Sequence, residues 1–247
     1  MKKYELITPC HFGLESVLKY EIQKIGGTDL RVSDGRISFT GDENIVARAN
    51  LCLSTAERVL IELIEFKATT FEELFQGVRA VELERYIGPD DAFPVKGYSL
   101  NSDLFSVSDC QAIIKKAVVE RLKTKYRIPW FEETGALYQI QFSIMKNQVS
   151  LFIDTSGKGL HKRGYRPAHN AAPLKETMAA AMVGLSRYRG REDLCDPFCT
   201  LCFPRLTGNT AKPRDRLICD DIFPAIHHRA IPKAHRPVFS LFHQWDG

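Results

Sequence analysis

The chain has 247 residues, of which 44% are hydrophobic and 26% charged, with a formal net charge of +4. This is the composition of an ordinary globular protein, and the small net charge excludes a polycation that binds anions along its whole length. No apolar run approaches the roughly 18 residues that a transmembrane helix needs, and the first residues lack the apolar core of a signal peptide. We therefore expect a cytoplasmic protein that does not contact membranes, with its seven cysteines as free thiols rather than disulfides.

Residues 1–66 are predicted to form a small unit of alternating strands and helices. Apolar residues recur at helical spacing between Leu14 and Ile25, and Gly26 follows where a glycine commonly ends a helix. The predicted order is strand, helix, strand, helix and strand, at residues 3–9, 14–25, 35–41, 42–53 and 57–68. Short pieces in this order favour an α+β sandwich of the ferredoxin-like kind over a parallel α/β domain.

A second α+β unit is predicted over residues 67–155. Its clearest element is a helix over residues 108–126, which has one apolar stripe and whose start we place at a capping box of Ser108 and Gln111. Strong alternation over residues 136–156 predicts a hairpin that turns near Asn147. The remaining predicted elements are a helix and a strand, at residues 69–82 and 92–100.

The pattern changes after these two units. Residues 156–172 form a basic linker, and residues 173–190 favour a helix with a proline in its first turn and a glycine at its end. A short strand that runs into a turn is predicted at residues 192–199. Residues 200–247 hold prolines so closely spaced that no long helix fits between them, so we expect an irregular tail there.

Three cysteines in this region have the spacing of an iron–sulfur ligand set. Cys195, Cys199 and Cys202 follow the C-x3-C-x2-C pattern of radical S-adenosylmethionine enzymes. Those enzymes usually have an aromatic residue where this chain has Leu201, and they continue into a long β/α run that is missing here. We therefore interpret the spacing as accidental. The sequence also lacks the spacing of a structural zinc site, a nucleophile elbow, a P-loop and a G-x-G-x-x-G motif, so we expect no metal site.

Four sequence blocks carry a resemblance to a known family. They are KGYSLNSDLFSVSDCQAIIKKAVVERLK, VSLFIDTSGKGLHKRGYR, APLKETMAAAMV and DPFC, at residues 96–123, 149–166, 172–183 and 196–199. In this order they resemble the THUMP-domain class I RNA methyltransferases, in particular the bacterial enzymes that methylate guanine N2 of large-subunit ribosomal RNA. The resemblance covers residues 1–199 nearly end to end.

The resemblance implies a protein of three parts. A ferredoxin-like unit and a THUMP domain would together bind structured RNA, and a Rossmann-like domain would bind S-adenosylmethionine. The implied fold class is therefore α+β, followed by the incomplete start of a Rossmann-like α/β methyltransferase domain at residues 173–199. The DPFC block resembles the beginning of the family's cofactor loop, so the implied cofactor contacts are Asp196, Pro197, Phe198 and Cys199.

The sequence departs from the family after Cys199. The expected G-S-G-T is replaced by TLCF, and the N-P-P-Y motif that faces the target amine is absent. A turn with these side chains cannot approach the cofactor closely, because glycine is needed there. The abrupt change predicts a reading-frame shift or a truncated gene, with residues 200–247 off-frame. We expect a chain that binds RNA, assign it no catalytic residue, and expect that cofactor binding is lost.

Two other interpretations of the sequence remain open. One is a stand-alone THUMP RNA-binding module without enzyme activity, in which residues 200–247 form a genuine, protease-resistant tail. The other is a THUMP-linked thiouridine synthetase or a cluster enzyme. The synthetase needs a P-loop-like S-G-G-x-D-S, which the sequence lacks.

The predicted RNA contacts are mainly cations, because phosphates supply most of the affinity of RNA-binding proteins and position the RNA. The basic segment SGKGLHKRGYRPAHN contains no acidic residue, which fits either a phosphate-binding segment or a solvated linker. Tyr165 fits either base stacking or packing on the protein. The full set of predicted contacts to RNA, with ribosomal RNA as the expected partner and no DNA expected, is Lys96, Asn101, Lys115, Lys116, Lys158, His161, Lys162, Arg163, Tyr165 and Arg166.

Overall fold

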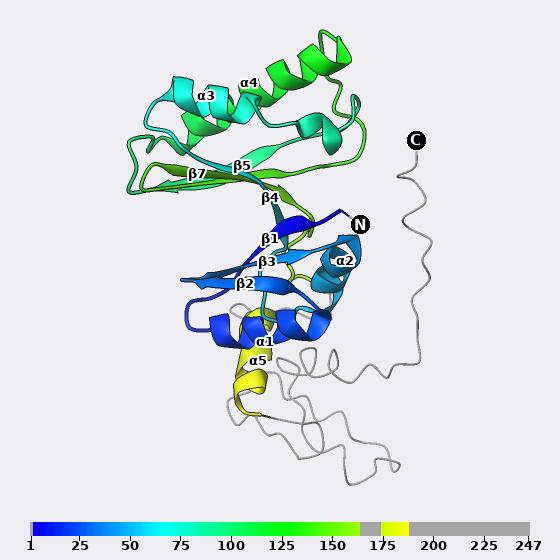
Figure 1. Ribbon diagram of the computed structural model, residues 1–247, viewed down its shortest axis with the longest axis vertical. Coiled ribbons are helices and arrows are strands. Elements are labelled where there is room, and N and C mark those ends of the chain that lie inside the picture. The colour runs from blue at the N-terminus through cyan, green and yellow to red at the C-terminus, as the bar shows by residue number, and fades with distance from the viewer. Residues whose placement is uncertain (1, 164–173, 188–247) are drawn as a thin grey trace. The chain divides into compact units, whose positions relative to one another are not determined.

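The structure is a computed structural model that describes residues 2–163 and 174–187. The chain divides into two units, residues 1–163 and 164–247. Within the first unit, two groups of helices and strands share one sheet of seven strands, in the order β2-β3-β1-β4-β7-β6-β5 (Figure 1). The strands and helices of this unit form the two groups that the sequence predicts.

The first group has the order βαββαβ, which is the ferredoxin-like order. Its strands are antiparallel, with β1 between β3 and β4, and helices α1 and α2 pack on each other and on β3. The ferredoxin-like fold predicted from the sequence is thus confirmed. The elements are β1 (Tyr4–Pro9), α1 (Glu15–Ile25), β2 (Thr28–Ser33), β3 (Arg36–Gly41), α2 (Glu43–Cys52) and β4 (Leu60–Lys67).

The sequence predicted five of these six elements and missed β2. This strand lies at the edge of the sheet, and of its six side chains only that of Leu30 is partly buried. A strand that is exposed on both faces has no alternation of apolar and polar residues to reveal it. The predicted end of the first helix is confirmed, since Gly26 lies in the left-handed region with φ of 94°.

The second group corresponds to the residues that resemble a THUMP domain, and we call it the THUMP-like part. Two helices cover one face of its strands. Strand β5 is parallel to β6, and β7 is antiparallel to both β6 and β4. Helices α3 and α4 pack side by side over these strands (Figure 1). The elements are α3 (Phe71–Arg79), a 3-10 turn (Leu83–Arg85), β5 (Val95–Leu100), α4 (Val107–Tyr126), β6 (Ile140–Met145) and β7 (Gln148–Asp154).

The capping box predicted for α4 is wrong. The residue at the N-cap of α4 is Ser106, whose side chain makes no capping hydrogen bond, and Ser108 already lies inside the helix. The structure instead has a capping box at α3. There Thr70 Oγ1 accepts a hydrogen bond from Glu73 N at 3.2 Å, while Glu73 Oε2 accepts one from Thr70 N at 3.3 Å.

Strand β4 belongs to both groups. Its first residues pair with β1 at Leu60 and Ile61, whereas the pairing with β7 runs along the strand to Lys67. The boundary predicted between residues 66 and 67 therefore falls at the end of a shared strand. Each group still has its own buried core, with Phe39 in the first and Phe93 in the second.

Of the second unit, the structure describes one helix, α5 (Glu176–Leu185). This helix lies within the range 173–190 that the sequence predicted. The predicted strand at 192–199 and the tail at 200–247 lie outside the described residues. Among the residues that the structure describes, no helix is both long and apolar enough to cross a membrane.

Candidate nucleic-acid interface

The predicted RNA contacts of the THUMP-like part differ in the solvent exposure of their side chains. Lys96 on β5 and Lys116 on α4 are exposed. Asn101, directly after β5, is exposed and adopts the left-handed conformation with φ of 49°. Because successive side chains of a strand point to opposite faces and Val95 packs into the core, Lys96 faces away from α3 and α4. The structure therefore places Lys96 and Lys116 on opposite sides of the sheet.

Lys115 is engaged inside the protein. Its Nζ lies 2.5 Å from Glu133 Oε1, donates to the carbonyl oxygen of Phe93 at 3.1 Å, and lies 3.6 Å from the centroid of the Phe93 ring. These contacts tie α4 to the segment before β5 and to the segment before β6. A phosphate would have to compete with all three of them.

Four more of the predicted contacts lie in residues 155–163, which we call the exit segment because they follow β7. Lys158 and Lys162 are exposed, whereas His161 and Arg163 are partly buried. Tyr165 and Arg166 lie outside the described residues, as do the cofactor residues Asp196, Pro197, Phe198 and Cys199.

Arg163 donates to three backbone carbonyls. Its Nε bonds to Leu160 O at 3.0 Å, its Nη1 to Leu51 O at 2.7 Å and its Nη2 to Leu53 O at 2.6 Å. Leu51 lies in the last turn of α2 and Leu53 follows directly, where helical carbonyls lack partners within the helix. The guanidinium thus acts as a cap for the C-terminal end of α2.

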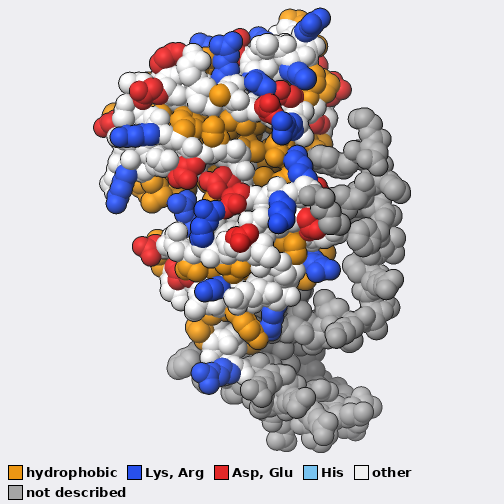
Figure 2. Space-filling view, in the orientation of Figure 1, with side chains coloured by type: hydrophobic (Ala, Val, Ile, Leu, Met, Phe, Trp, Pro, Cys, Tyr) orange, Lys and Arg blue, Asp and Glu red, His pale blue; other side chains and the backbone are white. Residues whose placement is uncertain are grey.

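The charged side chains of both signs are mixed on the surface. Figure 2 shows Lys and Arg interspersed with Asp and Glu on the visible face rather than gathered in one basic field. This distribution agrees with the formal net charge of +4. We therefore expect RNA to contact small groups of cations rather than one continuous basic surface.

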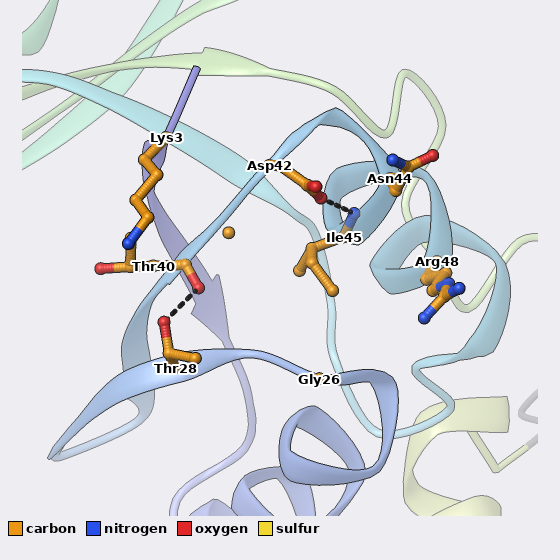
Figure 3. Close-up of a pocket in the computed structure, with 9 residues that line it drawn as sticks. Lys3, Gly26, Thr28, Thr40, Asp42, Asn44, Ile45 and Arg48 are labelled. Carbon is orange, nitrogen blue, oxygen red and sulfur yellow. Dashed lines mark hydrogen bonds between the residues drawn. The ribbon is translucent and has the colours of Figure 1, made fainter. Parts of the chain in front are cut away.

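One hollow in the ferredoxin-like part brings together cations that the sequence reasoning missed. It has a volume of about 400 Å³ and lies beside the N-terminus of α2, with Lys3 and Arg48 on its wall (Figure 3). Thr28 and Thr40 also line it, and the Thr28 hydroxyl donates to Thr40 O at 3.3 Å. Lys3 and Arg48 are far apart in the sequence, so no local pattern could have joined them.

The helix end at this hollow is already capped. Asp42 Oδ1 accepts a hydrogen bond from Ile45 N at 2.9 Å, and this bond lowers the pKa of the Asp42 carboxyl. An anion in the hollow would therefore meet a carboxylate as well as Lys3 and Arg48. Within the described part of the chain, no group of three or more His, Cys, Asp or Glu side chains is arranged to hold a metal ion.

Comparison with known families matches three consecutive parts of the chain. The RlmL ferredoxin-like domain matches residues 5–60, the THUMP domain matches residues 68–154, and the RMKL-like methyltransferase domain matches residues 163–200. The first two matches agree with the two groups of elements that share the sheet. The α+β fold class predicted from the sequence is confirmed.

Similar proteins share most of this chain but extend well beyond the matched part. "Putative RNA methyltransferase YpsC" of Bacillus subtilis (strain 168) is 44% identical over 201 residues, which are 81% of this chain and 52% of that protein. A crystal structure from Listeria monocytogenes str. 4b F2365, described as a predicted N6-adenine-specific DNA methylase, is 48% identical with a TM-score of 0.77 and shares 81% of this chain and 52% of its own. The chain thus spans about half the length of these relatives.

Two further structures extend the comparison. SMU.472, a methyltransferase candidate complexed with SAH, is 39% identical with a TM-score of 0.75, over 81% of this chain and 53% of its own. TrmN from Thermus thermophilus is 15% identical with a TM-score of 0.55, over 75% of this chain and 55% of its own, and shows a shared fold. The matches define a protein with a ferredoxin-like domain, a THUMP domain and a segment of a methyltransferase domain. Over these parts the chain is similar to THUMP-domain methyltransferases, as its sequence blocks suggested.

Proposed function

We propose that this chain is the RNA-binding portion of an S-adenosylmethionine-dependent methyltransferase that acts on guanine N2 of ribosomal RNA in the cytoplasm. The observation that carries the proposal is the match to the THUMP domain at residues 68–154, a domain that is folded here with its own buried core. The name of the 44% identical relative from Bacillus subtilis supports RNA as the substrate. The description of the Listeria structure makes DNA the competitor that a binding test must include.

Four exposed lysines are the proposed phosphate contacts: Lys96, Lys116, Lys158 and Lys162. A solvated ammonium can pair with phosphate without breaking a hydrogen bond within the protein. Lys116 would give up only its contact with the Phe75 ring, whose centroid lies 5.6 Å from its Nζ. Lys115 and Arg163 are proposed instead to act within the protein, because carboxylate and carbonyl oxygens already occupy their donors.

Removal of these four charges tests the binding proposal. We expect the wild-type chain to bind a structured fragment of ribosomal RNA with a log affinity that falls linearly with log salt, by roughly 0.7 to 0.9 for each phosphate contact. The variant with all four lysines changed to Gln should lose roughly 3 units of this slope. Fluorescence anisotropy at several salt concentrations measures both.

A control variant changes four other exposed lysines to Gln, namely Lys19, Lys24, Lys67 and Lys146. It alters the net charge by the same amount, so a general effect of charge would appear equally in both variants. Equal slopes in the two variants would contradict the assignment of contacts. Tighter binding of duplex DNA than of RNA by the wild type would contradict the proposed substrate.

The same proposal holds that this chain does not transfer a methyl group. The residues after Cys199 do not fit the cofactor, since Thr200 and Leu201 stand where the family has glycine and serine and the backbone must approach closely. We expect no transfer of labelled methyl from S-adenosylmethionine to ribosomal RNA above background. Incorporation of label by the purified chain would refute this half of the proposal without affecting RNA binding.

A further inference from the structure

The exit segment is bonded to the ferredoxin-like part along most of its length. Its first residues contact the segment before β4. Thr155 N donates to Val59 O at 3.1 Å, and Val59 N donates to Ser156 Oγ at 2.8 Å. The Asn50 side chain joins both residues to α2, since it donates to Thr155 Oγ1 and accepts from Ser156 Oγ, each at 2.8 Å. A solvated linker would make none of these bonds.

Glu57 contacts the middle of the exit segment, at Leu160 and His161. Its backbone oxygen accepts a hydrogen bond from Leu160 N at 2.9 Å, and its carboxylate lies between two imidazoles. Oε1 is 3.1 Å from His11 Nε2 and Oε2 is 3.2 Å from His161 Nδ1. The Leu160 side chain is 9% exposed and belongs to the ferredoxin-like core. Apolar burial and polar contacts therefore fix the same short stretch.

Arg163, the last residue of the exit segment, binds the C-terminal end of α2. The last turn of α2 contains no basic residue of its own, although a cation there is favoured by the helix dipole and by the free carbonyls. Arg163 provides this cation from a distant part of the sequence. Three donors on a rigid planar group meet three oxygens, which a lysine ammonium cannot reproduce with the same geometry.

We propose that Glu57, His161 and Arg163 are positioning residues that fix the point at which the chain leaves the two RNA-binding domains. The methyltransferase-like part begins at this point, at residue 163 by its family match. The inference rests on the proposed function, because a fixed starting point matters only if RNA held by one part is presented to the other. Their role is thus to limit the positions open to the following part relative to the bound RNA.

Trypsin tests the anchoring directly on the full 247-residue chain. Lys162 precedes Arg163, so cleavage after Lys162 requires the anchor to open, whereas cleavage after Lys146, exposed in the turn between β6 and β7 and outside the exit segment, serves as an internal reference. We expect Arg163→Lys to speed cleavage after Lys162 by about tenfold relative to cleavage after Lys146, the factor that corresponds to one lost hydrogen bond. Glu57→Gln, which removes the negative charge that faces His11 and His161, should speed it as well. Both substitutions nearly preserve side-chain size, and Arg163→Lys keeps the charge. An unchanged ratio would overturn the proposal.

A distance measurement separates positioning from mere stability. Dyes attached through unnatural amino acids at Lys19 and at the exposed Met182 of α5 report the spread of distances between the two units. We expect the spread to widen in both variants while the affinity for RNA stays as in the wild type and the melting temperature of the first unit falls by only about 2–4 °C. An equal spread in variants and wild type would overturn the positioning role. Failure of the wild type to bind RNA would instead refute the proposed function, and the trypsin result would be unaffected by it.

Discussion

At the scale of single residues, the Arg121 and Glu84 pair joins α4 to the 3-10 turn. Arg121 donates through Nε to Glu84 Oε2 at 3.0 Å and through Nη2 to Oε1 at 2.5 Å. The paired guanidinium lowers the pKa of the Glu84 carboxyl, mainly through these hydrogen bonds. A bidentate pair that is largely screened from water is one of the few surface ion pairs expected to stabilise a fold measurably.

The lowered pKa predicts how this stabilisation depends on pH. Because the pKa of Glu84 is lower in the folded state, its contribution is fully present above the unfolded value of about 4.3 and is lost as pH falls through the folded value. We expect Glu84→Gln to reduce the free energy of unfolding by about 1 kcal/mol at pH 7. Urea unfolding between pH 7 and pH 3 measures the difference, which should shrink below about pH 4. A difference that grows as pH falls would contradict the assignment.

The described cysteines should differ sharply in reactivity. Burial, with a smaller effect of the nearby carboxylates of Glu15 and Glu57, raises the pKa of the Cys10 thiol to about 11. Cys52, in contrast, is exposed. Since the thiolate is the nucleophile, we expect iodoacetamide at pH 8 to modify Cys52 well before Cys10. Mass spectrometry of timed samples measures this order, and equal rates would show that Cys10 is accessible in solution.

At the scale of elements, α3 and α4 begin in different ways. The Thr70 and Glu73 side chains satisfy backbone donors at the start of α3, whereas Ser106 caps nothing at the start of α4. We expect Thr70→Ala to cost about 1 kcal/mol of stability. Ser106→Ala is the matched control and should cost clearly less. Thermal unfolding of both variants measures the contrast, and equal losses would show that the capping box contributes nothing particular.

The same elements show what could be read from the sequence. The S-x-x-Q pattern at Ser108 satisfied the rule for a capping box, but that rule does not specify where a helix begins, and tertiary contacts placed the start of α4 earlier. The T-x-x-E pattern at Thr70 was equally visible and was the correct one. Periodic apolar residues predicted the long elements well, whereas β2 stayed hidden because it buries almost nothing.

For the whole molecule, the order and class of the domains could be predicted, but the partners of individual cations could not. The sequence shows Lys115 and Arg163 as basic residues in basic segments. It cannot show that the oxygens of Phe93, Glu133, Leu51 and Leu53 surround them, because those contacts arise only when distant parts of the chain meet. For the same reason the sequence could not show that Lys3 and Arg48 line one hollow.

Because β4 is shared between two cores, it affects how the chain folds while it is synthesised on the ribosome. The ferredoxin-like part has all its strands once Lys67 has left the exit tunnel. Strand β7 lies between β4 and β6, so the THUMP sheet stays open until Asp154 has also emerged. During that interval the outer edge of β4 is an unpaired strand edge, which is the kind of surface on which nascent chains aggregate. Synthesis speed between residues 67 and 154 should therefore influence yield more than speed elsewhere in the first unit.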